Sequence, residues 1–140
     1  MPLTRVYLPL TPDDLDALAA GRDLGPAPLA AHGVTPALGR PGLTTDEEEL
    51  EHEAWVAATE EASARAAGAR RVVASADVDA AVVSVPERPD VPTRVELGAG
   101  VPRTRVVSFH VDEEAGGTGT ADLLWYDVTE LDDVRALLAP

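Results

Sequence analysis

The chain contains no cysteine and no lysine among its 140 residues. The lack of cysteine excludes disulfide bonds, thiolate nucleophiles, and zinc or iron–sulfur sites built on cysteine ligands. Because all 11 basic residues are arginine, catalysis through a lysine Schiff base is excluded as well. Long apolar runs are also missing. No stretch of about 18 apolar residues is present, so we expect no membrane-spanning helix.

The charge and the N-terminal residues limit the partners and the location. The first ten residues lack the basic start and apolar stretch of a secretory signal, which predicts a cytoplasmic protein. With 25 acidic residues, the formal net charge is −14, which opposes approach to a phosphate backbone. We therefore expect neither a nucleic acid nor a membrane as partner. The exclusive use of arginine indicates a GC-rich genome, such as that of an actinobacterium or a salt-adapted organism.

Length and a hydrophobic content of 45% predict one globular domain over residues 1–140. Alternating apolar residues indicate strands, and apolar residues at helical spacing indicate helices. The expected strands lie at 4–10, 29–38, 70–78, 93–100, 103–113 and within 121–133. The expected helices lie at 11–21, at about 46–67 and from 129 to the C-terminal end. This order predicts an α+β sandwich with a mixed sheet of five or six strands and three helices, mainly on one face.

Each expected helix begins with a capping signal. Thr11 precedes Pro12, which suits the first helical position. Thr45 and Glu48 form the reciprocal pair of a capping box before the long helix, and Thr129 precedes the last helix. Acidic residues fill the first turns, where the helix dipole favours them. The starts of the helices therefore account for part of the excess of acidic residues.

The stretch SFHVDE holds the strongest candidate for a site. On an extended strand, His110 and Asp112 point to the same face. This geometry suits two metal ligands, or a base and the group that orients it. A metal would need a third protein ligand, which the sequence does not identify. A hydrogen-bonded pair at the strand end is the structural alternative.

The stretch ADLLWYDVTELDD, residues 121–133, places two of the five aromatic residues side by side. Strand alternation puts Trp125 and Asp127 on one face and Tyr126 on the other, so one ring should be in the core. The strand and the helix after it leave only Asp127 unexplained. A ligand-binding pocket would be formed by Tyr7, His110, Asp112, Tyr126 and Asp127.

Other candidates have stronger structural explanations. Glu49 and His52 share the Glu-x-x-His spacing of di-iron helices, but such sites need a second helix of this kind. A solvated helix face explains this pair better. We expect His32 to be exposed at a loop or strand entry. No serine lies in the G-x-S-x-G motif of serine hydrolases.

The acidic start of the long helix is a candidate partner surface. Glu47, Glu48 and Glu51 would attract a basic protein through complementary charge. A solvated and capped helix start is the alternative.

Six stretches, taken together in order and spacing, resemble a family of short actinobacterial proteins of unknown function. The most specific are VYLPLT near the start and LLWYDVTEL near the end. The resemblance covers nearly the whole chain and implies an actinobacterial source and no assigned activity. Members of the family more commonly have tyrosine at the position of His52. The HVDE stretch, which contains His110 and Asp112, matches the family pattern. The six stretches are RVYLPLT, AHGVTPAL, DEEELEHEA, RRVVASADV, RVVSFHVDE and LLWYDVTEL.

The sequence therefore predicts a non-enzymatic protein-interaction or regulatory module without metal or cofactor and without catalytic residues. The alternative is a small-molecule or metal-dependent enzyme with its pocket around His110 and Asp112. The oligomeric state is left open.

Overall fold

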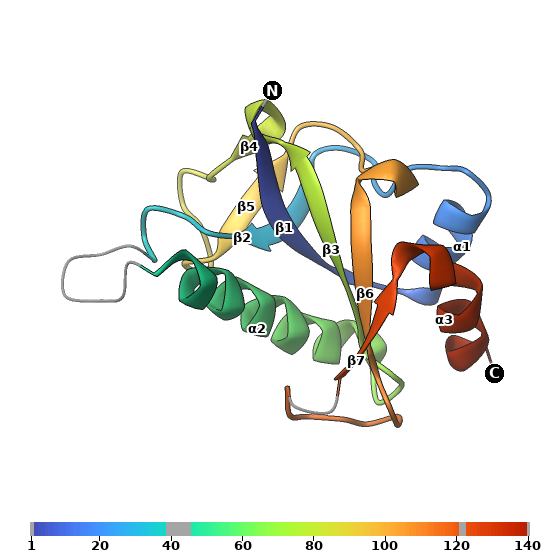
Figure 1. Ribbon diagram of the computed structural model, residues 1–140. Helices are drawn as coiled ribbons and strands as arrows, with labels where there is room; N and C mark the ends of the chain where they lie inside the picture. The colour runs from blue at the N-terminus through green and yellow to red at the C-terminus, as the bar shows by residue number, and fades with distance from the viewer. Residues whose placement is uncertain (1, 39–45, 121–122, 140) are drawn as a thin grey trace.

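The computed structural model describes residues 2–38, 46–120 and 123–139. Within these residues, seven strands form one sheet in the order β4-β5-β2-β1-β3-β6-β7 (Figure 1). The strands are β1 (Leu3–Leu10), β2 (Leu29–Gly33), β3 (Val72–Asp79), β4 (Val83–Ser84), β5 (Arg94–Leu97), β6 (Val106–Asp112) and β7 (Leu123–Asp127). The α-helices are α1 (Pro12–Ala19), α2 (Glu47–Ala66) and α3 (Leu131–Leu138). No helix in the described ranges could span a bilayer.

Every pair of neighbouring strands is antiparallel, so the expectation of a mixed sheet with five or six strands was wrong. The additional strand is β4, which has only two residues. Helix α1 is also short: its eight residues span about 12 Å, against about 26 Å for the eight residues of β1. It therefore spans less than half the length of β1, and the chain re-enters the sheet antiparallel to that strand.

The longer helix α2 does connect two strands that run in the same direction. Strands β2 and β3 lie on either side of β1, and both are antiparallel to it. The 20 residues of α2 join them, and the helix packs over β1, β2 and β3 (Figure 1). It therefore covers only part of this face, and the sheet continues past it into β6 and β7.

Of the three α-helices in the described residues, α1 and α3 lie on one face of the sheet, and the longer α2 lies on the other. On one face, alternate residues of the strands pack against α1 and α3 and form the main core. On the other face, Tyr7 and Val73 pack against small residues of α2, namely Ala54, Ala58 and Ala62. The main core includes Val6, Leu8, Leu15, Leu18, Val72, Ala74, Phe109, Val111, Leu131 and Val134.

The helix starts agree only in part with the expected caps. Thr11 caps α1 in a capping box, as predicted. At α2, Asp46 is the N-cap, and its carboxylate accepts hydrogen bonds from the backbone N–H groups of Glu48 and Glu49. The predicted partner of that box, Thr45, lies outside the described residues.

Thr129 does not cap the last helix. Asp127 instead caps the 3-10 turn at Val128–Glu130, which leads directly into α3. Its carboxylate accepts hydrogen bonds from the backbone N–H and the hydroxyl of Thr129, at 2.9 and 2.7 Å. The side chain of Glu130 completes the box by accepting from the backbone N–H of Asp127. A carboxylate takes this position because it can accept from both donors of Thr129 at once.

Candidate functional site: an aromatic cavity beside helix α2

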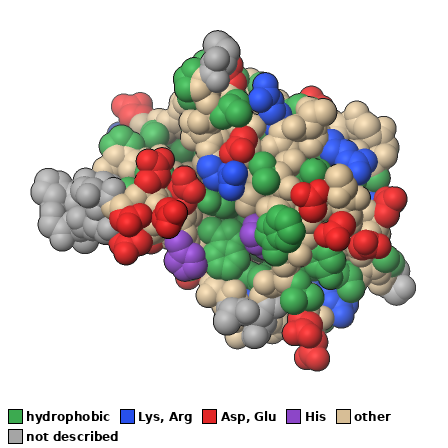
Figure 2. All heavy atoms as spheres, in the orientation of Figure 1, with side chains coloured by type: hydrophobic (Ala, Val, Ile, Leu, Met, Phe, Trp, Pro, Cys, Tyr) green, Lys and Arg blue, Asp and Glu red, His purple; other side chains and the backbone are tan. Residues whose placement is uncertain are grey.

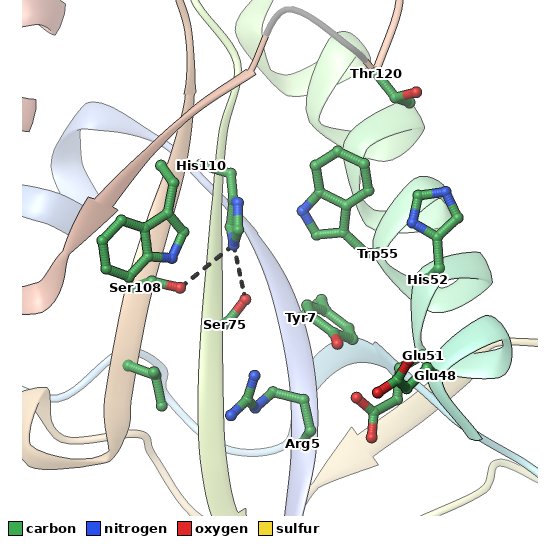
Figure 3. Close-up of a pocket in the computed structure, with 12 residues that line it drawn as sticks. Arg5, Tyr7, Glu48, Glu51, His52, Trp55, Ser75, Ser108, His110 and Thr120 are labelled. Atoms are coloured by element: carbon green, nitrogen blue, oxygen red, sulfur yellow. Dashed lines mark hydrogen bonds between the residues drawn. The ribbon is translucent and has the colours of Figure 1, made fainter. Parts of the chain in front are cut away.

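An open cavity of about 600 Å³ lies where α2 stops covering the sheet. We call it the α2 cavity. Side chains of β1, β3 and β6 that face α2 line it, together with residues from the first half of α2 and from β7 (Figure 3). Figure 2 shows this side of the molecule, with hydrophobic and histidine side chains next to a cluster of acidic ones. The lining residues are Arg5, Tyr7, Glu48, Glu51, His52, Trp55, Ser75, Val107, Ser108, His110, Thr120 and Trp125.

His110 on β6 is a polar group on the sheet side of the cavity. Its Nε2 lies 3.0 Å from the hydroxyl of Ser75 and 3.4 Å from that of Ser108 (Figure 3). Burial, assisted by the positive charge of Arg5, lowers the pKa of His110 to about 4. The ring is therefore neutral near pH 7, with one nitrogen donating and the other accepting.

Arg5 and Tyr7 provide the β1 side of the cavity. The guanidinium of Arg5 donates from Nε and Nη2 to both carboxylate oxygens of Asp77, at 2.6 and 3.2 Å. This hydrogen bonding raises the pKa of Arg5. Burial, followed by the nearby carboxylate of Glu51, raises the pKa of the Tyr7 phenol. The β1 side thus presents a neutral phenol and a cation whose charge Asp77 balances.

Two tryptophans give the cavity its aromatic character. Trp55 on α2 stacks on His52, with ring centroids 5.6 Å apart, and meets His110 edge to face at the same separation. Its indole N–H is buried and has no hydrogen-bond partner among the described residues. Trp125 on β7 lies opposite His110 in the strand register and is 61% exposed. The two indoles therefore come from opposite elements, one from the helix and one from the edge strand.

The structure brings together only two of the five predicted ligand-binding residues. Tyr7 and His110 both line the α2 cavity. Asp112 shares their face of the sheet, but its carboxylate forms a buried ion pair with Arg71. Tyr126 packs against the main core on the opposite face. Asp127 is the cap described above.

The predicted partner-binding residues lie at the start of α2. Glu48 and Glu51 line the α2 cavity, whereas Glu47 is exposed and lines a smaller neighbouring hollow. Among the described residues, no group of three side chains could hold a metal ion.

Sequence reasoning missed Trp55, Trp125, Ser75 and Ser108 as cavity residues. Ser108 lies two residues before His110 on one strand and so shares its face. Trp55 lies one helical turn after Glu51. Pairing of β3 and β6 places Ser75 opposite Ser108, and a single sequence does not reveal that pairing.

His32 was expected to be exposed, but it is buried at 2% exposure on β2. Its ring contacts the Thr93 hydroxyl at 2.7 Å and the Glu61 carboxylate at 3.1 Å. Burial and the charge of Arg94 lower the pKa of His32. Arg94 also binds Glu61 at 2.6 Å, so these contacts fasten the second half of α2 to strands β2 and β5.

The fold and the site define a small α+β protein whose antiparallel sheet has helices on both faces and an aromatic cavity on one. The chain belongs to a family of unknown function, DUF6912, whose profile matches residues 4–134. No curated protein and no solved structure matches the chain. The predicted resemblance to a family without an assigned activity is therefore confirmed, and the actinobacterial source stays a prediction.

Proposed function

We propose that the protein is a non-enzymatic binding module that holds a small organic ligand in the α2 cavity. The observation behind this proposal is the cavity itself. Its volume of about 600 Å³ lies within the usual range of ligand pockets, about 300–1,000 Å³. Aromatic side chains and a few convergent polar groups line it, which is the composition typical of such pockets.

The exposure of Trp125 supports the same proposal. Large aromatic side chains contribute most when they are buried, yet this indole is 61% exposed at the cavity. A ligand between Trp125 and Trp55 would bury apolar surface on both rings. The His110 ring and the two serine hydroxyls beside it would orient such a ligand through hydrogen bonds.

Nuclear magnetic resonance tests this proposal directly because the chain has only two tryptophans. We expect some members of a chemically diverse fragment library to shift the indole N–H signals of both Trp55 and Trp125. Trp125→Ala should abolish this binding. Leu124→Ala is the matched control, since Leu124 is the preceding residue of β7, is 40% exposed and does not line the cavity. Absence of any fragment that shifts the two indoles, or binding that survives Trp125→Ala, would contradict the proposal.

One observation favours a second candidate function, an enzyme in which Ser75 is the nucleophile. The 3.0 Å separation between its hydroxyl and His110 Nε2 is that of a nucleophile and its general base. In this mechanism His110 would take the Ser75 proton as the oxygen attacks an acyl carbon, and would give it to the leaving group as the bond between that group and the acyl carbon breaks. A pKa of about 4 makes His110 a weak base, and Asp112, which could orient it, is bound to Arg71.

A fluorophosphonate probe distinguishes the two candidates, because it reacts covalently with activated serines. Mass spectrometry of the treated protein should show no adduct on Ser75 if the protein only binds its ligand. An adduct on Ser75 that disappears in His110→Gln would support the enzyme.

A further inference from the structure

We propose that the α2 cavity recognises an organic cation, a protonated amine or a guanidinium group. This inference rests on the proposed function and adds the chemical class of the ligand. It depends on three properties of the cavity: its uncompensated negative charge, its aromatic surfaces, and the ion pair that its arginine, Arg5, forms with Asp77.

The uncompensated charge of the lining is negative. Glu48 and Glu51 contribute two carboxylates, and no ion pair within the described residues involves either. Arg5 contributes one positive charge, which Asp77 balances through two hydrogen bonds. The net charge of −14 on the whole chain adds to the attraction of a cation.

The helix dipole does not account for the position of Glu51. The helix dipole explains carboxylates in the first turn, such as Glu48. Glu51 is the fifth residue of α2 and lies beyond that turn. Its side chain is half-buried, and its charge acts on both Tyr7 and Arg5 on the β1 side of the cavity. It lines the cavity together with Tyr7 and Arg5 of the sheet (Figure 3), where a bound cation would sit.

The aromatic rings offer the complementary surface. A cation within about 6 Å of the centre of a tryptophan or tyrosine ring is attracted to the ring face, and tryptophan is the best of these. Trp125 is largely exposed, and Trp55 and Tyr7 line the same cavity. Carboxylates and ring faces together bind ammonium or guanidinium groups better than either does alone, because each favours positive charge.

An anionic ligand fits the cavity less well. The Nε and Nη2 donors of Arg5 already bind Asp77, and the chain has no lysine to supply another cation. A carboxylate ligand would also face the charges of Glu48 and Glu51. The cation could belong to a free amine or to an arginine or lysine side chain of a basic partner protein, which the acidic start of α2 would also attract.

Three probes with the same ring test the charge preference: benzylammonium, benzyl alcohol and benzoate, with charges of +1, 0 and −1. Titrations followed by the indole signals of Trp55 and Trp125 should show benzylammonium binding about tenfold more tightly than benzyl alcohol. Benzoate should be the weakest. Equal or tighter binding of benzyl alcohol or benzoate overturns the inference but leaves the proposed cavity function intact. Failure of all three to shift the indoles also overturns it, whereas the proposed function depends on the wider fragment screen.

Two isosteric variants test which carboxylate attracts the cation. Glu51→Gln should remove most of the preference for benzylammonium, with an about threefold to tenfold loss of its affinity and little change for benzyl alcohol. Glu49→Gln is the matched control, because Glu49 is exposed on the same helix and does not line the cavity. An equal loss in both variants would mean a general effect of net charge and would overturn the site.

A capped peptide distinguishes the two sources of the cation. If a partner's side chain is the ligand, acetyl-Gly-Arg-Gly-amide should shift both indoles and compete with benzylammonium. If the ligand is a free amine, benzylammonium binds and the peptide does not. Both outcomes support recognition of an organic cation.

Discussion

Arg71 and Asp112 form an ion pair in which both side chains are at most 2% exposed. The guanidinium donates to the two carboxylate oxygens at 2.8 and 2.7 Å, and the Arg71 backbone N–H donates to one of them at 2.7 Å. The guanidinium also donates to the carbonyl of Gly119 at 2.6 Å. The pair thus joins β6 to the start of β3 and to the segment that leads toward β7. It explains why Asp112 is not in the α2 cavity.

Asp112→Ala should destabilise the fold by about 3–5 kcal/mol, because it removes the carboxylate that balances the charge of the buried guanidinium. Asp16→Ala is the control: it breaks an ion pair with Arg135 in which both side chains are at least 40% exposed. Asp16→Ala should lower the free energy of unfolding by less than about 1 kcal/mol. Urea unfolding measures both values, and similar costs for the two variants would contradict the structural role of the buried pair.

Gly117→Ala should disturb the same ion pair by steric contact. A Cβ atom built at Gly117 would lie 2.5 Å from a carboxylate oxygen of Asp112 and 3.1 Å from the guanidinium of Arg71. We expect a loss of about 1–3 kcal/mol, as for other substitutions that overfill a packed site. A Cβ built at Gly119 meets no atom within 4 Å, so Gly119→Ala should leave the unfolding midpoint nearly unchanged. Equal midpoints for the two variants would contradict the prediction.

The buried histidines should make the fold sensitive to acid. The pKa of His110 falls from 6.5 to about 4 on folding, so between these values the unfolded chain binds more protons. The free energy of unfolding should therefore decrease as the pH falls from 6.5 toward 4. The contribution of His110 should approach about 1.4 kcal/mol per pH unit. The lowered pKa of His32 acts in the same direction.

Two measurements check the role of His110 in this acid sensitivity. Its imidazole resonances should titrate with a midpoint near pH 4. His110→Gln should flatten the pH dependence of unfolding in that window. An unchanged slope in this variant would assign the sensitivity to other groups. The lowered pKa values of Glu61, Asp90 and Asp127 act at lower pH, through carboxylates.

The close packing of α2 on the sheet depends on small side chains of the helix. Ala58 is fully buried against the sheet, so Ala58→Leu should destabilise the protein by about 1–3 kcal/mol. Ala64→Leu adds the same atoms at an exposed position of the helix and should be tolerated. Thermal unfolding compares the two, and equal stability would mean that α2 does not pack closely on the sheet.

Local signals in the sequence predicted most of the elements. The alternation in residues 4–10 and 70–78 gave strands β1 and β3, and Thr11 with Pro12 marked the start of α1. Strand direction was predicted wrongly because it depends on how far a connecting helix reaches, which the order of elements does not reveal. The order of elements also does not reveal which strands pair: β5 and β6 are consecutive along the chain, yet β5 pairs with β2 and β4, and β6 with β3 and β7.

The sequence predicted only those features of the candidate site that follow from the alternation of side chains along a strand. The separation of Trp125 from Tyr126 across the sheet followed from their adjacency, and the structure confirms it. Asp112 was misplaced because its partner, Arg71, is 41 positions away. The role of Asp127 is not evident from the sequence because Thr129 and Asp127, two residues apart, are equally suitable N-cap residues.

The place of β1 in the middle of the sheet has a consequence for the order in which the fold forms during synthesis. The strand made first becomes the centre, and later strands extend the sheet on both sides of it, β2 and β5 on one and β3 and β6 on the other. Strand β7 comes last and occupies an edge. A ribosome-bound chain that ends before residue 123 therefore lacks Trp125, the aromatic residue that the edge strand contributes to the α2 cavity.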